Sequence, residues 1–290
     1  MTGTLLSRRR CGRASRLLPA ALALLPLCGV MAGCSLTAPA AVPAPAAVGA
    51  PDRSQFAQLV HALVERAQRL DTLKSEAVME YKGGGQHVKA REEIVLKRPS
   101  SLRVEAFTPF GVAAVVAANG STLAIYQPSE NTFYRGAATA GALNRFAQIP
   151  LPPQQAIKLL MGLLPEDEAH FTSPGSVRFE DGLLIGAYQL PGGTVDELGF
   201  ADGQLRLVRV DGKNGAASYE VHYSDYHDIG GLEFAHHLEA SFLNTGTQLN
   251  VRYSEVIINP TLSDTEFTLV PQGSVRQIDL DQPAATGGNG

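Results

Sequence analysis

The chain has 290 residues, with 24 basic and 28 acidic side chains, three cysteines and no tryptophan. This length is enough for one large domain or two modest ones with a hydrophobic core. The acidic excess disfavours a nucleic-acid partner, because proteins that bind nucleic acid usually carry a basic surface.

Residues 1–33 have the layout of an export signal. Five arginines form a positive segment, and the apolar run at 17–30 that follows is too short and too interrupted by proline to span a bilayer comfortably. The small residues Ala32 and Gly33 then precede Cys34. We expect this signal to be removed, which leaves 19 basic against 28 acidic residues and a net charge of about −9.

Cys34 is the one cysteine outside the predicted signal, because Cys11 and Cys28 lie within it. The exported part therefore can form no internal disulfide and offers no thiol downstream for catalysis. One interpretation of Cys34 is that it is an incidental residue of a cleaved signal; the other, lipid attachment, depends on the family resemblance given below. Residues 35–51 are mostly alanine, proline and valine without charge, and predict an extended tether.

The globular part is predicted to span residues 52–275 and to be mainly β. Apolar residues at three- and four-residue steps predict a helix from Asp52 or Ser54 to about Leu73. Alternating segments between short Gly, Pro and Asn turns then predict an antiparallel meander, interrupted by two short helices at 138–146 and 154–163. We count about eleven strands. A sheet this wide curls, so we expect an unclosed half-barrel with helices capping its concave face. Residues 276–290 are predicted to be a flexible tail.

No catalytic or metal-binding motif stands out. The chain lacks a G-x-S-x-G elbow, an S-x-x-K set and an H-E-x-x-H motif. Four histidines, at 222, 227, 236 and 237, lie close together, but the adjacent His236 and His237 point to opposite faces of a strand. We therefore predict a protein that is not an enzyme and that needs neither metal nor cofactor.

Several motifs resemble those of the outer-membrane lipoprotein-sorting family, which includes LolA-like carriers and LolB-like receptors. The residues before and at the cysteine, 31–34, resemble a bacterial lipobox. At 96–136, Arg98, Pro99, Leu102 and Arg103 are followed by Pro109, Phe110 and Gly111 in a pattern similar to the strand-turn-strand of that family. Residues 151–165 resemble the receptor's proline-led helix, and 253–273 resemble the carrier's closing strand.

The resemblance implies a lipidated Cys34 that anchors the chain at the periplasmic face of an outer membrane. It also implies an apolar cavity for acyl chains of lipoproteins or lipids, a periplasmic carrier as a partner, and lipoprotein sorting as the process. Phe110, between Pro109 and Gly111, stands nearest the exposed leucine that helps transfer in the receptor. Its ring is either exposed for insertion into lipid or packed under the turn. Arg103 resembles an arginine near the cavity lid, and the alternative is an arginine on the strand surface. We expect a monomer. The alternative is a structural or partner-binding lipoprotein whose cavity is filled by its own side chains.

Overall fold

The computed structural model describes residues 52–213, 218–271 and 273–282. The predicted signal at 1–33, Cys34 with the tether to residue 51, and the end of the predicted tail at 283–290 lie outside the described residues.

The described residues form three α-helices, three short 3-10 helices and fourteen strands. The helices are α1 (Arg53–Gln68), η1 (Pro128–Glu130), α2 (Ala140–Ala147), α3 (Pro153–Leu160), η2 (Glu168–Phe171) and η3 (Asp264–Phe267). The first strands are β1 (Thr72–Gly83), β2 (Gln86–Lys97), β3 (Ser101–Thr108), β4 (Gly111–Asn119), β5 (Thr122–Gln127), β6 (Thr132–Ala137) and β7 (Ser176–Glu180). The others are β8 (Leu183–Gln189), β9 (Val195–Ala201), β10 (Gln204–Asp211), β11 (Tyr219–Ile229), β12 (Leu232–Phe242), β13 (Thr247–Ile258) and β14 (Arg276–Asp279).

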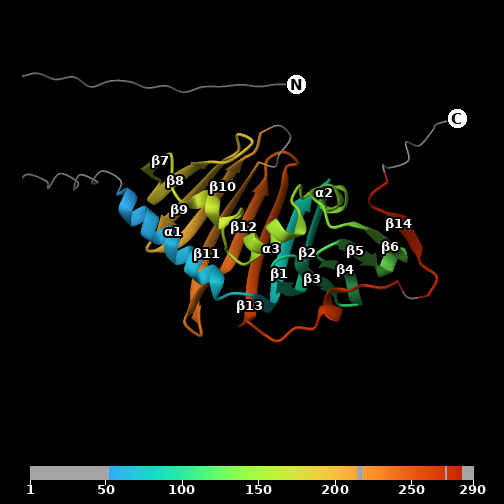
Figure 1. Cartoon of the computed structure of the whole chain (residues 1–290). Helices are drawn as coiled ribbons and strands as arrows, with labels where there is room; N and C mark the ends of the chain where they lie inside the picture. The colour runs from blue at the N-terminus through green and yellow to red at the C-terminus, as the bar shows by residue number, and fades with distance from the viewer. Residues whose placement is uncertain (1–51, 214–217, 272, 283–290) are drawn as a thin grey trace, which may run out of the picture. The chain divides into compact units, whose positions relative to one another are not determined.

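All fourteen strands belong to one sheet that does not close (Figure 1). Two meanders, β1 to β6 and β7 to β13, are joined by the antiparallel pairing of β1 with β13. The two ends of the sheet are β7 and β14, which do not pair with each other. The prediction of a mainly β, unclosed architecture is therefore confirmed.

The predicted number of about eleven strands is wrong, because β7, β9 and β14 were missed. In β9 the apolar alternation is broken by the acidic Asp196 and Glu197 and by Gly199. Strand β7 has only five residues. Strand β14 lies in the predicted flexible tail and has four residues, which pair with β6 in parallel rather than antiparallel orientation. Such short or polar strands carry little periodicity of their own and depend on a partner strand.

Helix α1 begins where the sequence placed it. The Asp52 carboxylate accepts hydrogen bonds from the backbone N–H groups of Ser54 (2.7 Å) and Gln55 (3.3 Å), which have no partner within the helix. The helix ends at Gln68, five residues before the predicted end, because β1 starts at Thr72.

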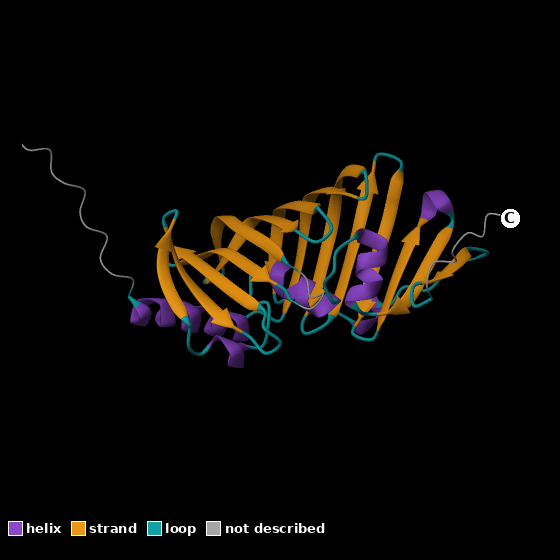
Figure 2. Ribbon diagram, turned by 90° about the horizontal axis from the view of Figure 1, so that it is seen from above, coloured by secondary structure: helices purple, strands orange, loops and turns teal. Residues whose placement is uncertain are grey.

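The three α-helices lie on one side of the curved sheet (Figure 2). Helix α1 buries Phe56, Val60, Leu63 and Ala67. The Phe56 ring packs edge-on against Phe200 of β9, with 5.5 Å between ring centroids. Helix α1 therefore fills the concave face over the strands of the second meander.

Candidate functional site

The concave face holds a cavity of about 560 Å³ that lies over the first meander and extends to strands β11 to β13 of the second. This volume lies within the range of about 300–1,000 Å³ that is usual for small-molecule sites. Its floor is formed by β1 to β4 together with β11 to β13, and helices α2 and α3 contribute the other walls. The lining is mostly apolar, with Leu102, Val104 and Val116 from the sheet and Phe146 and Leu160 from the helices. The protein's own side chains therefore fill the concave face under α1, but they leave this part of the concave face open.

Small side chains explain the hollow in the sheet floor. Ala106 of β3 and Ala114 of β4 are cross-strand partners, and both line the cavity. Directly opposite residues on one face of a sheet have neighbouring side chains, so two alanines leave a depression that larger residues would fill. The larger cross-strand pair Val104 and Val116 lies two residues further along the same strands and forms the adjoining wall.

Helix α3 is held in place by side chains that bind its C-terminal carbonyl groups. The Tyr223 hydroxyl donates to the Leu159 carbonyl (2.9 Å), and the Tyr253 hydroxyl donates to the Leu160 carbonyl (3.0 Å). Arg66 of α1 donates to the carbonyls of Met161 (2.8 Å) and Gly162 (2.7 Å). Carbonyl groups at a helix C-terminus lack intrahelical partners, so these bonds fix this wall of the cavity.

Helix α2 forms the other helical wall and ends near two hairpin turns. The Phe146 ring packs against Tyr134 of β6, with 5.5 Å between centroids. The Tyr81 hydroxyl of β1 donates to the Ala147 carbonyl (3.0 Å), and the Thr245 hydroxyl donates to the Gln148 carbonyl (2.8 Å). The C-terminal end of α2 is therefore tied to the end of the sheet where β1 turns into β2 and β12 turns into β13.

The tip of the β3–β4 hairpin exposes Phe110. Thr108 and Gly111 pair with each other, so Pro109 and Phe110 are the two turn residues. The Thr108 hydroxyl donates to the Gly111 carbonyl (3.0 Å), and Gly111 has a φ of 119°, a conformation that favours glycine. The Phe110 side chain is 99% exposed. Of the two environments considered for it, the structure shows the exposed one.

Other exposed apolar side chains lie at the same end of the sheet. The strand register places the β1–β2 turn beside the β12–β13 turn, because Lys82 pairs with Gln248. Leu243, in the latter turn, and Val88, near the former, are exposed, and Val88 with Gln86 also lines the cavity. The β3–β4 tip is at this end too, since Phe107 pairs with Arg91. The cavity thus reaches toward a rim of exposed apolar residues, which we call the apolar rim (Val88, Phe110 and Leu243).

Arg103 does not lie at the cavity, in contrast to the expectation from the family resemblance. Leu102 and Val104 on either side line the cavity, so the period of two in β3 directs Arg103 to the other face. There its guanidinium binds the Glu105 carboxylate and donates to the Glu266 carbonyl (3.1 Å) of η3. Arg98 of the same motif contacts an α-helix, because it donates to the carbonyls of Ala67 and Leu70 at the end of α1.

Glu92 of β2 is a cavity residue that the sequence reasoning missed. Its side chain lines the cavity and is 8% exposed. Burial raises the pKa of this carboxyl to about 7. The alternation along β2 indicates that Glu92 faces the core side. Ala90, Glu92, Ile94 and Leu96 share one face of the strand, and the other three are apolar.

The four histidines considered as metal ligands do not converge on one point, although the His227 and His236 rings pack edge-on with 4.5 Å between centroids. His222 contacts Glu220 (2.5 Å), His227 contacts Asp225 (3.0 Å), and His237 contacts Ser224 (3.0 Å). Within the described residues, no group of three His, Cys, Asp or Glu side chains could hold a metal ion. Across the same ranges of the chain, no helix has the length and apolar character needed to cross a membrane.

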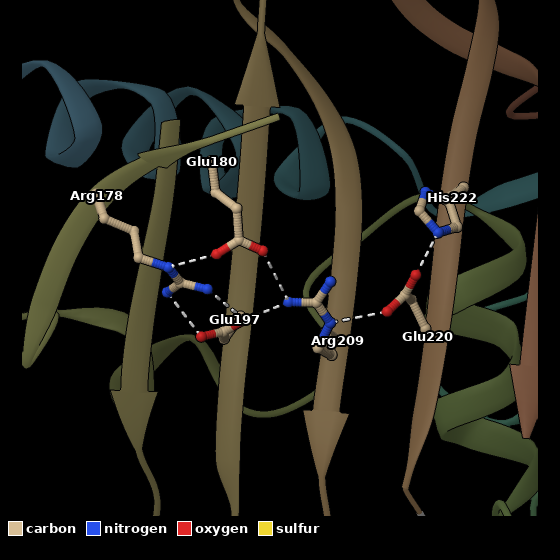
Figure 3. A network of polar contacts seen from close by, with 6 residues as sticks. All are labelled: Arg178, Glu180, Glu197, Arg209, Glu220 and His222. Carbon is tan, nitrogen blue, oxygen red and sulfur yellow. Dashed lines mark hydrogen bonds and ion pairs between the residues drawn. The ribbon is translucent and has the colours of Figure 1, made fainter. Parts of the chain in front are cut away.

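The opposite face of the second meander carries a row of alternating charges (Figure 3). Glu197 of β9 accepts from Arg178 (2.8 Å) on one side and from Arg209 (2.8 Å) on the other, and Arg209 also donates to Glu220 (2.7 Å). The hydrogen bonds from Arg178 and then from Arg209 lower the pKa of Glu197, against the opposing effect of burial. This polar outer face contrasts with the apolar concave face.

No protein-family model matches the sequence, and no curated protein matches it. A DUF1329 family protein from Desulfovibrio piger aligns with a TM-score of 0.51 at 14% identity, over 76% of this chain and 98% of that chain. A LolA superfamily protein from Nitrosomonas europaea aligns with a TM-score of 0.47 at 12% identity, over 72% and 97%. A domain from Vibrio parahaemolyticus, provisionally named as outer membrane lipoprotein-sorting, aligns with a TM-score of 0.48 at 10% identity, over 74% and 97%.

The first of these similarities shows that the curved sheet with its helices is a fold already seen in a solved structure. At 14% identity, the likeness to the Desulfovibrio piger protein concerns the fold alone.

Proposed function

We propose that this chain binds the acyl chains of lipids or lipoproteins in the cavity of the first meander, without catalysing a reaction. The open apolar cavity between β1–β4 and helices α2 and α3 is the observation that carries the proposal. Each methylene group removed from water contributes about 0.8 kcal/mol, so an apolar hollow shelters an acyl chain from the aqueous phase.

The anchoring and sorting roles are parts of the same proposal. Acylation of Cys34 would hold the chain at the periplasmic face of an outer membrane, since two or more acyl chains give stable anchoring where one does not. The domain would then accept lipoprotein from a periplasmic carrier. The apolar rim supports this proposal, because exposed apolar side chains at the cavity end could enter a lipid surface.

Filling the cavity should abolish acyl binding. Ala114→Phe places an aromatic ring in the hollow beside Ala106, and we expect the affinity for N-phenylnaphthylamine, an apolar fluorescent probe, to fall at least about tenfold, or about 1.4 kcal/mol. The titration uses the chain with Cys34→Ala, so that no attached lipid competes. Ala57→Phe, at an exposed position of α1, is the matched control, expected within about twofold of the parent. Equal affinities for the two variants would contradict the assignment of the cavity.

Removing the Phe110 ring should weaken binding to lipid. Transfer of an exposed aromatic side chain into an apolar phase is worth roughly 1.5–3 kcal/mol, so Phe110→Ala should reduce the fraction bound to phosphatidylcholine vesicles about tenfold or more. Co-sedimentation of the Cys34→Ala chain with vesicles measures this without the anchor. Phe179→Ala, at an exposed position on the β7 edge, is the control. Unchanged vesicle binding by Phe110→Ala would exclude this tip as the insertion point.

A further inference from the structure

Glu92 is a carboxyl group without a partner in the mostly apolar lining of the cavity. Among the described residues it has no hydrogen bond or ion pair, and its Oε2 atom is inaccessible to solvent. Its cross-strand neighbours are Ala77 of β1 and Ala106 of β3, neither of which offers a donor side chain. The carboxyl group therefore stands in the hollow that the small residues leave open.

The other charged residues of the cavity lie elsewhere in its lining and have their own contacts. Arg145 of α2 donates to the Gln282 carbonyl, and Glu130 of η1 interacts with the Tyr134 hydroxyl. No basic side chain of the described chain pairs with Glu92. A buried acceptor without a donor is unfavourable, and a group that binds in the cavity and donates to it relieves this cost.

A charged amine satisfies Glu92 better than other donors do. Hydrogen bonds between an ammonium group and a carboxylate are about twice as strong as those between neutral groups. A fatty-acid carboxylate would instead place a second negative charge beside Glu92, which is unfavourable at low dielectric. The apolar lining extends along the strands in both directions from Glu92, with Met79 and Val88 toward the β1–β2 turn and Leu102 toward the other end, so an aliphatic chain can contact it in either direction.

We propose that Glu92 is the recognition point for a protonated amino group, and that the cavity therefore selects aliphatic amines over fatty acids. This inference rests on the proposed function, since it concerns the ligand of the same cavity. It assigns to the cavity a class of ligand, long-chain amphiphiles that carry an ammonium group.

The test compares three ligands with the same alkyl chain: dodecylamine, laurate and dodecanol. Each displaces the fluorescent probe N-phenylnaphthylamine from the chain carrying Cys34→Ala, at about pH 8, above the pKa of about 7 of Glu92. We expect dodecylamine to bind at least about tenfold more tightly than laurate, and Glu92→Gln to reduce this ratio to about twofold or less. Dodecanol should bind the parent and the Gln variant within about threefold of each other, because it depends on the apolar lining.

Two further variants keep the result unambiguous. Glu92→Leu removes the polar group altogether and should lose the preference for the amine in the same way. Glu93→Gln, on the opposite face of β2 where it pairs with Lys74 (3.1 Å), is the matched control and should keep the preference. Thermal unfolding of each variant checks that it is folded.

The outcomes separate this inference from the function on which it rests. If the three ligands bind but the ratio of amine to laurate is the same in the parent and in Glu92→Gln, the role of Glu92 is overturned and the cavity remains an acyl site. If Glu92→Gln weakens dodecanol as much as dodecylamine, Glu92 serves a neutral donor and the preference for amines is overturned. If no ligand binds, the proposed function itself fails.

Discussion

Asp196→Asn is expected to stabilise the protein more at about pH 8 than at about pH 4. The change in the free energy of unfolding that it causes should differ by up to about 4 kcal/mol between the two pH values. Asp196 of β9 is fully buried, and neither of its carboxyl oxygens has a hydrogen-bond partner. Burial, and secondarily the charge of Glu166, raises the pKa of this carboxyl to about 7. Its surroundings are Tyr188 of β8 and Val210 of β10, its cross-strand partners, with Tyr219 nearby on β11.

The direction of this effect follows from the two protonation equilibria. In the unfolded chain an aspartate ionises near pH 3.9, whereas in the folded chain Asp196 stays protonated up to about pH 7. Below the lower value both states are protonated, and the raised pKa costs nothing. Between the two values the unfolded state loses its proton first, so the stability of the native protein falls as the pH rises. Asparagine does not ionise and removes this pH-dependent loss.

Urea unfolding of the parent and of Asp196→Asn at the two pH values measures the difference. Other titrating groups cancel, because both proteins contain them. Asp202→Asn, at an exposed position in the β9–β10 turn, is the control and should show the same difference at both pH values. A gap between parent and Asp196→Asn that stays constant with pH would show that Asp196 is ionised in the folded protein at pH 7.

Truncation of Phe56 is expected to cost about 3–5 kcal/mol, the range for a buried phenylalanine replaced by alanine. Its ring is fully buried between α1 and the sheet, against Phe200 and Tyr188. The ring lies directly over Gly186 of β8, where any Cβ atom would overlap it. Phe56 and Gly186 therefore form a complementary pair that holds α1 on the second meander.

A double-mutant cycle tests this complementarity. Gly186→Ala alone should destabilise the protein by about 1–3 kcal/mol, because it overpacks the site. In the Phe56→Ala background the overlapping ring is absent, so the same change should cost little, which gives a coupling energy of about 1–3 kcal/mol. Gly175→Ala, where the new Cβ would meet the Ala187 carbonyl oxygen at an ordinary 3.7 Å, is the control. Equal costs of Gly186→Ala in both backgrounds would contradict the packing described here.

The site residues differ in how far the sequence predicts them. The turn at Pro109–Gly111 was identified, because proline and glycine mark a turn locally, but the exposure of Phe110 was left open. The resemblance placed Arg103 near the cavity lid, but its position between Leu102 and Val104 directs it to the other face, in agreement with the alternative of a strand-surface arginine. Glu92 was overlooked because a carboxyl on an apolar strand face gives no motif, and its significance depends on what lies opposite.

By itself the sequence determined the β-rich class, the start of α1, the two central helices and most of the hairpins. These features depend on residues that are near one another in the chain, whose periodicity and turn chemistry act locally. The tertiary structure alone decided that α1 fills one half of the concave face and leaves a cavity in the other. That division depends on contacts between distant segments, such as Phe56 over Gly186 and Ala106 beside Ala114. It also decided which carboxyl groups, Glu92 and Asp196, were removed from water without a partner.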